Sequence, residues 1–217
     1  PDVLALQELK LVDDKFPADE LKAAGYHAVC HGQKTYNGVA LLTRQPVTNV
    51  VKNVPTFPDE HARAIAGSIG ELRTLKRHDD FIRAAAIVVK EWPQTQFVLA
   101  GVDTSSTGEV RQQLERLVTE LGLAERFHFL GWLDDAEKLL AALDVFVSAS
   151  ETESFGLAIA EAMAAGTAVV ATETCGAREV IEDERTGLLV PIGDVPRIAR
   201  AVTSLLVDEQ QRKQLGG

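Results

Sequence analysis

From residue 64 to the end of the chain, short apolar segments alternate with amphipathic ones, and this alternation constrains the fold more than any other feature. The apolar segments are only three to six residues long and rich in Val, Ala, Leu and Phe, as expected for buried strands. The longer segments carry apolar residues at three- and four-residue spacing, as expected for helices. The predicted strands are residues 64–69, 97–100, 127–130, 145–148, 168–171 and 188–190, and the predicted helices are residues 79–91, 109–121, 136–143, 155–165, 178–181 and 195–206.

Strands that alternate with helices along a chain form parallel sheets, because each parallel pair needs a crossover connection. The crossovers are right-handed and place helices on both faces of the sheet. We therefore predict an α/β fold for residues 64–217, a doubly wound parallel Rossmann-like sheet. In such sheets the ligand crevice lies at the carboxyl ends of the strands.

Residues 1–63 show a different pattern. Strand-like segments are joined by polar turns, and a short helix is opened by Pro17 and closed by Gly25. We predict a small mixed α/β fragment with a largely antiparallel sheet and a thin core, so that the chain has two domains, 1–63 and 64–217. The predicted strands are residues 3–6, 26–29, 39–43 and 48–53, the predicted helix is residues 17–24, and residues 55–60 are predicted to be a surface loop or linker.

Charge and cysteine content limit the classes of function. The formal net charge is −10 over 217 residues, which disfavours binding to nucleic acid because phosphate contacts need clustered Lys and Arg. Cys30 and Cys175 are the two cysteines, too few for a disulfide framework or a cysteine zinc site, so a cytoplasmic location is expected. Neither a membrane-spanning apolar run nor a signal peptide is expected, and a chain that begins with Pro1 is predicted to be a fragment. The oligomeric state cannot be read from the sequence.

Two glutamates, Glu153 and Glu161, lie seven residues apart just after the predicted strand 145–148. Between them a helix begins, and the free N–H groups and positive dipole end of a helix N-terminus suit a phosphate. Glu153 lies in the loop, where its carboxylate can accept hydrogen bonds from sugar hydroxyls, whereas Glu161 lies further along the helix, within reach of a ribose diol. The alternative interpretation is a buried alanine-rich helix with two solvated glutamates.

Residues 67–217 resemble the C-terminal, donor-binding domain of retaining glycosyltransferases with the two-Rossmann-domain (GT-B) fold, in the large family that carries an E-x7-E motif. The resemblance implies transfer of a hexose from a nucleotide-diphosphate sugar to an acceptor that the sequence does not identify, with no divalent metal cofactor required. The matching segments occur in the order Gly70-Glu71-Leu72 with Lys76, then residues 97–101, 129–133, 144–148, 153–166 and 187–191.

The resemblance also assigns roles to residues. Glu153 would contact the donor sugar and Lys76 would neutralise phosphate charge, which makes these two the catalytic candidates, while Glu161 would bind the ribose. Glu179 is either a further donor contact or a helix-surface charge. The other substrate-binding candidates are Gly70, Ser154, Phe155, Gly156 and Leu157.

One position departs from the family pattern. Glu71 stands where the family usually has an arginine, and a carboxylate beside a diphosphate is repulsive. Three outcomes are open: Arg73 or Arg77 substitutes for the missing arginine, Glu71 turns away from the ligand, or donor affinity is reduced.

Residues 1–66 resemble an N-terminal fragment of the exonuclease III-type apurinic endonucleases, on residues 1–10, 31–34 and 38–43. The resemblance implies that Glu8 is a ligand of a catalytic Mg²⁺, and it makes a DNA-repair nuclease the alternative function. The other metal and base residues of that family have no counterpart here. The five histidines are expected to be surface or loop residues rather than catalytic ones.

Neither half is complete under these resemblances. A GT-B enzyme works in the cleft between two domains, and residues 1–66 do not resemble the missing one. We therefore expect a chimera of two truncated parts that binds a nucleotide sugar without turnover. A third interpretation is an α/β domain with no function.

Overall fold

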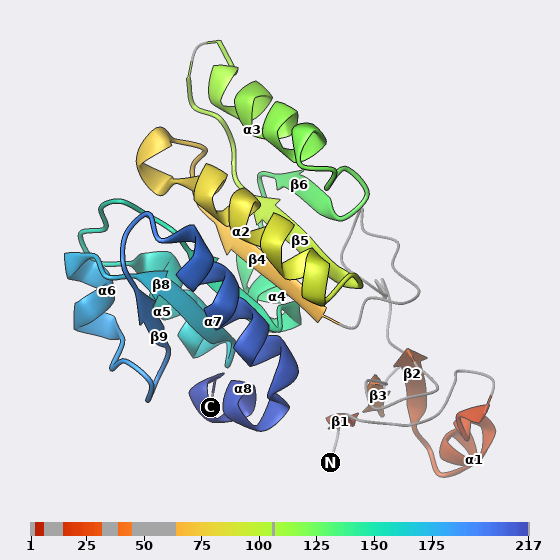
Figure 1. Cartoon of the computed structure of the whole chain (residues 1–217). Helices are drawn as coiled ribbons and strands as arrows, with labels where there is room; N and C mark the ends of the chain where they lie inside the picture. The colour runs from red at the N-terminus through yellow and green to blue at the C-terminus, as the bar shows by residue number, and fades with distance from the viewer. Residues whose placement is uncertain (1–2, 7–14, 32–38, 45–63, 106, 217) are drawn as a thin grey trace. The chain divides into compact units, whose positions relative to one another are not determined.

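The computed structural model describes residues 3–6, 15–31, 39–44, 64–105 and 107–216 (Figure 1). The chain divides into two compact units, residues 1–58 and residues 59–217, which have separate sheets. The predicted strand 48–53, the predicted linker 55–60 and the candidate metal ligand Glu8 lie outside the described residues. Within the described segments, no helix combines the length and the apolar character that crossing a membrane requires.

The first unit contains a three-stranded antiparallel sheet. Its strands are β1 (Val3–Leu6), β2 (His27–His31) and β3 (Val39–Thr43), in the order β1-β3-β2. The helix α1 (Ala18–Ala23) leads into β2 and packs beside it. This agrees with the mixed α/β, antiparallel arrangement that the polar turns predict.

The second unit is built on a six-stranded parallel sheet with the strand order β6-β5-β4-β7-β8-β9. The predicted doubly wound, Rossmann-like fold is therefore confirmed for this unit. The strand order runs outward in both directions from the neighbours β4 and β7, which makes their carboxyl ends the switch point of the sheet. The strands are β4 (Ala64–Ile69), β5 (Thr95–Ala100), β6 (Phe127–Gly131), β7 (Val145–Ser148), β8 (Ala168–Thr172) and β9 (Leu188–Val190).

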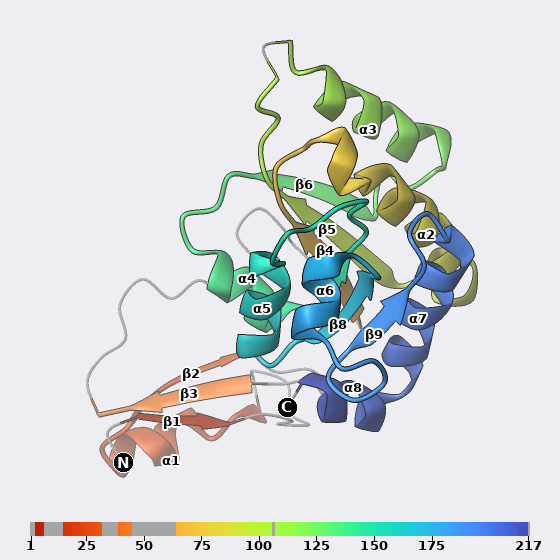
Figure 2. The same cartoon turned by 90° about the vertical axis from the view of Figure 1, so that its left-hand side faces the viewer.

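Helices cover both faces of this sheet. One face carries α2 (His78–Glu91), packed against α7 (Val195–Val207) and α3 (Glu109–Glu120). The opposite face, turned toward the viewer in Figure 2, carries α4 (Ala136–Ala142), α5 (Leu157–Ala164) and α6 (Cys175–Val180). The last helix, α8 (Glu209–Gly216), follows α7 and packs near β8.

The core explains why these segments adopt this arrangement. An aromatic cluster joins α2 to two strands, with ring centroids of Phe81 and Phe127 5.5 Å apart and those of Phe81 and Phe97 6.0 Å apart. Burying each of these rings contributes roughly 2–3 kcal/mol. At the centre of the sheet β4 has no room for a side chain at Gly67, because a Cβ there would lie 2.7 Å from side-chain atoms of Leu143 and Val98.

Some predicted element boundaries are wrong. The helix predicted to begin at residue 155 begins at Leu157, because Gly156 adopts a left-handed φ of 84° that ends the preceding loop. The short helix predicted at residues 178–181 begins earlier, at Cys175, because the Thr174 side chain caps it by accepting a hydrogen bond from the Ala177 N–H. The helix α8 was not predicted.

Candidate functional site

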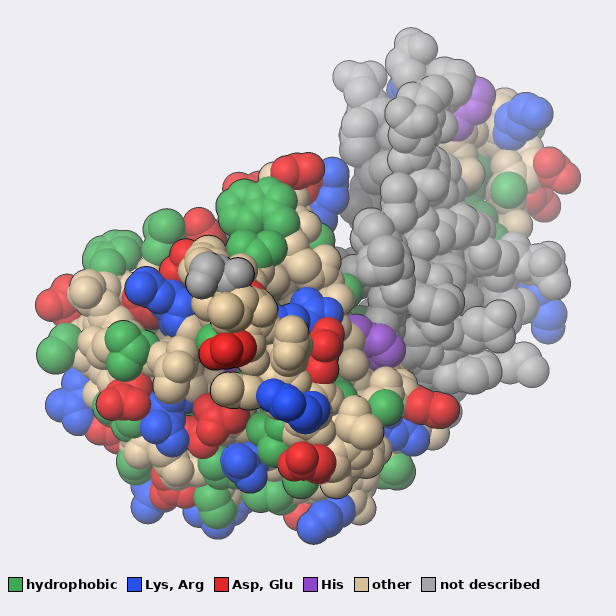
Figure 3. Space-filling view, turned by 90° about the horizontal axis from the view of Figure 1, so that it is seen from above, with side chains coloured by type: hydrophobic (Ala, Val, Ile, Leu, Met, Phe, Trp, Pro, Cys, Tyr) green, Lys and Arg blue, Asp and Glu red, His purple; other side chains and the backbone are tan. Residues whose placement is uncertain are grey.

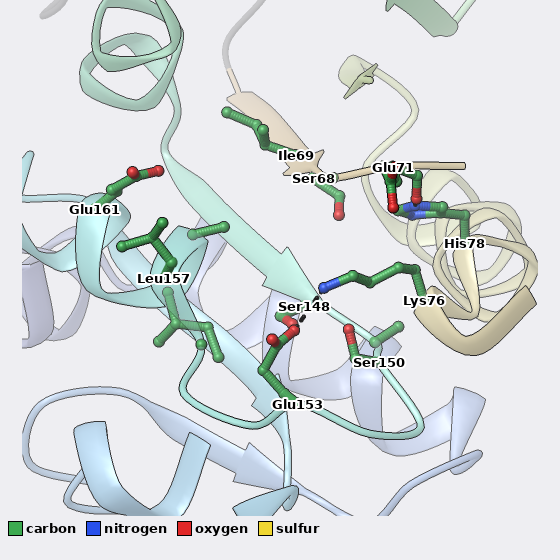
Figure 4. Close-up of a pocket in the computed structure, with 15 residues that line it drawn as sticks. Ser68, Ile69, Glu71, Lys76, His78, Ser148, Ser150, Glu153, Leu157 and Glu161 are labelled. Atoms are coloured by element: carbon green, nitrogen blue, oxygen red, sulfur yellow. Dashed lines mark hydrogen bonds and ion pairs between the residues drawn. The ribbon is translucent and has the colours of Figure 1, made fainter. Parts of the chain in front are cut away.

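A pocket of about 280 Å³ lies at the carboxyl ends of β4 and β7, which is the switch point of the sheet. Figure 4 shows its wall built from two loops, the one after β4 and the one after β7, together with the start of α5. Among the candidate site residues other than glycine, Lys76, Glu153, Leu157 and Glu161 line the pocket. The glycines Gly70 and Gly156 also line it.

The two catalytic candidates form an ion pair inside this pocket. Lys76 Nζ lies 2.7 Å from Glu153 Oε2, and the side chains are only 31% and 20% exposed. Lys76 comes from the loop after β4 and Glu153 from the loop after β7 (Figure 4). Of the Lys and Arg residues that the structure describes, Lys76 alone lines the pocket.

Two further contacts hold these loops together outside the Lys76–Glu153 pair. The Glu151 N–H donates to the Leu75 carbonyl oxygen over 2.8 Å, and Arg77 Nη1 lies 3.3 Å from Glu151 Oε2. Arg77 also donates from Nε to Asp80 at 2.6 Å, and this hydrogen bond raises the pKa of its guanidinium. Arg77 adopts a left-handed φ of 47°, which is uncommon for a residue with a side chain.

The start of α5 faces the same cavity. Leu157 and Ala158, the first residues of α5, both line the pocket. The first N–H groups of a helix have no acceptor within the helix and sit at its positive dipole end, so they favour an anion. Glu161 lies one turn further along α5, on the pocket wall but away from the Lys76–Glu153 pair (Figure 4).

The other predicted site residues, Ser154, Phe155 and Glu179, lie outside the pocket lining. Ser154 and Phe155 are exposed on the loop between β7 and α5, and Glu179 is exposed on α6. The loop is tied to α6 because the Gly176 N–H donates to the Glu153 carbonyl oxygen over 2.8 Å.

Glu71, which stands where the family usually has an arginine, lies near two arginines of this chain, Arg73 and Arg77. Glu71 lines the pocket, and its Oε2 lies 3.3 Å from Nη1 of Arg73. Arg77 is engaged by Asp80 and Glu151. Neither Arg73 nor Arg77 lines the pocket in the described part of the chain.

His78 is a pocket residue that the sequence interpretation placed wrongly, since it is buried rather than on the surface. Its Nε2 lies 3.0 Å from the Glu71 carbonyl oxygen, and we assign the ring proton to Nε2, which donates to that oxygen. Burial lowers the pKa of His78 to about 4, so the ring is neutral at neutral pH. Ser68 and Ser150, also missed, are buried in the lining. The signal for both is a serine near the carboxyl end of an apolar strand, Ser68 within β4 and Ser150 just after β7.

A doubly wound sheet with a charged pocket at its switch point is typical of proteins that bind nucleotides. The chain belongs to the Glycosyl transferases group 1 family, which matches residues 54–217. This confirms the resemblance of the second unit to that family.

Relatives and solved structures agree with this family. The chain is 43% identical over 108 residues to the lipopolysaccharide core biosynthesis glycosyltransferase LpsE of Rhizobium meliloti (strain 1021), covering 50% of this chain and 32% of LpsE. It is 36% identical over 167 residues to the phosphatidyl-myo-inositol mannosyltransferase of Mycolicibacterium smegmatis, covering 74% of this chain and 42% of that protein. The chain thus spans between about a third and two fifths of the length of these relatives.

Two solved structures share the fold. Anabaena HepE, solved in complex with UDP, is 30% identical with a TM-score of 0.67, over 70% of this chain and 41% of HepE. The C-terminal domain of the group 1 protein LpcC from Francisella tularensis is 30% identical with a TM-score of 0.65, over 74% of this chain and 89% of that domain.

Proposed function

We propose that the pocket binds a nucleotide-diphosphate sugar and that the chain is the donor half of a retaining hexosyltransferase. The proposal rests mainly on one observation: the ammonium group of Lys76 and the start of α5 line the same pocket, at the switch point of the sheet. Both features favour a phosphate, and both are found where such sheets bind nucleotides. HepE, which shares the fold, has been solved with UDP and with UDP-glucose.

In the proposed complex each group has one task. Lys76 neutralises charge on the diphosphate, together with backbone N–H groups of Phe155, Gly156 and Leu157, and this charge develops further as the sugar leaves. Glu153 accepts hydrogen bonds from the sugar, and Glu161 accepts them from the ribose diol. We place Gly70, Ser154 and Glu179 at the edges of the same site.

Glu71 works against this ligand. It adds a third carboxylate to a pocket that holds one ammonium group among the described residues, and this added negative charge repels a diphosphate. Reduced donor affinity is the outcome we propose for this position.

We propose that turnover needs more than the donor site of this chain. We propose that a further domain provides the acceptor site, because the chain spans between about a third and two fifths of the relatives named above. The acceptor is not identified.

Residues 1–63 are proposed to be a fragment of exonuclease III type, joined to the transferase unit as a chimera, with Glu8 as its remaining Mg²⁺ ligand. The match to the Glycosyl transferases group 1 family begins at residue 54, so it includes the last part of residues 1–63.

Location and cofactor use belong to the same proposal. A cytoplasmic site fits a chain with two cysteines. Nucleic acid is disfavoured as a partner, since the formal net charge is −10 and acidic and basic side chains are interspersed over the face seen in Figure 3. Among the described residues, no group of three or more His, Cys, Asp or Glu side chains is arranged to hold a metal ion. We propose metal-independent donor binding because the resemblance to the retaining GT-B transferases implies it.

Calorimetric titration with UDP-, GDP- and ADP-sugars tests the proposal directly. We expect saturable binding of one donor, unchanged by EDTA and weakened about tenfold or more in Glu161→Ala, because the ribose diol loses a charged acceptor. Glu91→Ala is the matched control, a glutamate exposed at the end of α2 and outside the pocket lining, and it is expected to leave donor affinity unchanged. A folded chain that binds none of the donors would refute the proposed function.

A further inference from the structure

We propose that Glu153 and the ligand diphosphate compete for Lys76, so that Glu153 makes the site discriminate between an intact nucleotide sugar and the nucleoside diphosphate left after transfer. The inference rests on the proposed function and adds a role in ligand selection. It starts from one contact, the 2.7 Å ion pair between Lys76 Nζ and Glu153 Oε2.

The geometry keeps this pair in place without any ligand. The Glu151–Leu75 backbone hydrogen bond and the Arg77–Glu151 ion pair join the same two loops, and the Gly176 N–H fixes the Glu153 backbone. Lys76 and Glu153 are therefore held within contact distance by groups that line no part of the pocket. A phosphate that approaches Lys76 meets an ammonium group that already has an anionic partner.

For a nucleoside diphosphate alone, Glu153 is unfavourable in two ways. The phosphate must take Lys76 from the carboxylate, and the displaced carboxylate then stays as a second anion beside it. Because the pair is only partly exposed, solvent screens this repulsion less than it would on the surface.

For a nucleotide sugar, the same displacement has a compensation. The sugar hydroxyls are donors, and the freed carboxylate accepts charge-assisted hydrogen bonds from them. Glu153 thus weakens binding of the nucleoside diphosphate and strengthens binding of the intact donor. After the sugar has been transferred, its hydroxyls are gone, Glu153 returns to Lys76, and release of the spent nucleotide is favoured.

The test compares two ligands on matched variants. UDP and UDP-glucose, or the guanosine or adenosine pair that the wild-type chain prefers, are titrated into wild type, Glu153→Gln and Glu173→Gln. We expect Glu153→Gln to bind the nucleoside diphosphate about three- to tenfold more tightly and the nucleotide sugar more weakly. Glu173→Gln removes the same charge from another ion-paired glutamate, on the loop after β8 and outside the pocket lining, and is expected to leave the ratio of the two affinities unchanged.

A second variant separates the loss of the Glu153 charge from other effects of placing an amide at this position. Glu153→Asp keeps the charge but withdraws the carboxylate from Lys76 by one methylene, and a smaller gain in nucleoside diphosphate affinity is expected. Equal shifts for both ligands in Glu153→Gln, or the same shift in Glu173→Gln, would overturn the competition while leaving the proposed function standing. A folded wild-type chain that binds neither ligand would overturn both.

Discussion

At the residue scale, His78 shows how a buried titratable group is built into the wall of the pocket. Its ring is buried at the start of α2 and donates to the Glu71 carbonyl oxygen, which fixes the backbone next to Gly70. The nearby charges have opposite effects on the pKa of His78: Lys76 lowers it and Asp79 raises it, and both effects are smaller than that of burial. The pocket therefore contains a hydrogen-bond donor that carries no charge at neutral pH.

This environment predicts a pH-dependent stability. The unfolded chain protonates His78 near pH 6.5 and the folded chain only near pH 4, so the unfolded state binds more protons between these values. The free energy of unfolding therefore falls as the pH falls from about 6.5 to about 4, by up to about 3 kcal/mol from this residue. Above pH 6.5 the contribution is fully present. Urea unfolding of wild type and His78→Gln across this interval isolates it, because Gln keeps an N–H donor without titrating. Parallel pH profiles for the two proteins would contradict the assignment.

The residue scale also shows the limit of sequence-based prediction. Lys76 and Glu153 were assigned to one site by their motifs, yet their mutual ion pair was not foreseen, because 77 positions separate them and only the fold brings them together. His78 was missed because it lies among charged residues, Lys76, Arg77 and Asp79, in a stretch that has the composition of a surface turn.

At the scale of elements, α6 supports the loop that carries Glu153. A Cβ at Gly176 would lie 2.6 Å from Phe155 N and 2.8 Å from the Glu153 carbonyl oxygen, both backbone atoms. Backbone cannot move aside as a flexible side chain can, so the close approach requires glycine at this position. The loop position is thus set by a neighbouring helix as well as by the strand before it.

Gly176→Ala is expected to push this loop out of place. We expect a loss of about 1–3 kcal/mol in the free energy of unfolding from the forced shift, with donor affinity reduced about tenfold or more. Thermal unfolding followed by circular dichroism and calorimetric titration measure the two effects. Cys175→Ala, at the exposed neighbouring position, is the control. Unaltered donor affinity in Gly176→Ala would show that the loop tolerates the shift.

Elements were predictable where the pattern was local. Every strand predicted within the described residues is present, because apolar runs of β-branched residues leave few alternatives. The helix α8 was missed since its exposed residues carry no apolar stripe. Its position depends on tertiary contacts, with Arg212 Nη1 donating to the Leu205 carbonyl oxygen over 2.7 Å and Arg212 Nη2 lying 3.5 Å from Asp144.

At the scale of the whole molecule, the two units differ in the hydrophobic core that stabilises them. The second unit has a continuous core from Ala64 to Leu215, while the first has three short strands and one six-residue helix among its described residues. A relative's C-terminal domain, 30% identical to this chain, has been crystallised.

Residues 59–217 are therefore expected to fold without residues 1–58. We expect the shortened chain to keep the thermal midpoint and the donor affinity of the full chain, because the pocket draws its lining from residues 68–161. Circular dichroism melting and the same titration check this. A shortened chain that aggregates, or that melts several degrees lower, would show that the first unit stabilises the second.

The separation of Lys76 and Glu153 along the chain has a consequence for how the protein is made. The loop after β4 is synthesised early, but β5, β6 and their helices must follow before β7 can insert beside β4. The pocket thus cannot exist on a nascent chain until Glu153 has left the ribosome. From then on, a ligand that contacts both loops links two segments that are far apart in the chain. Its binding is reversible, and it requires that β7 has already paired with β4.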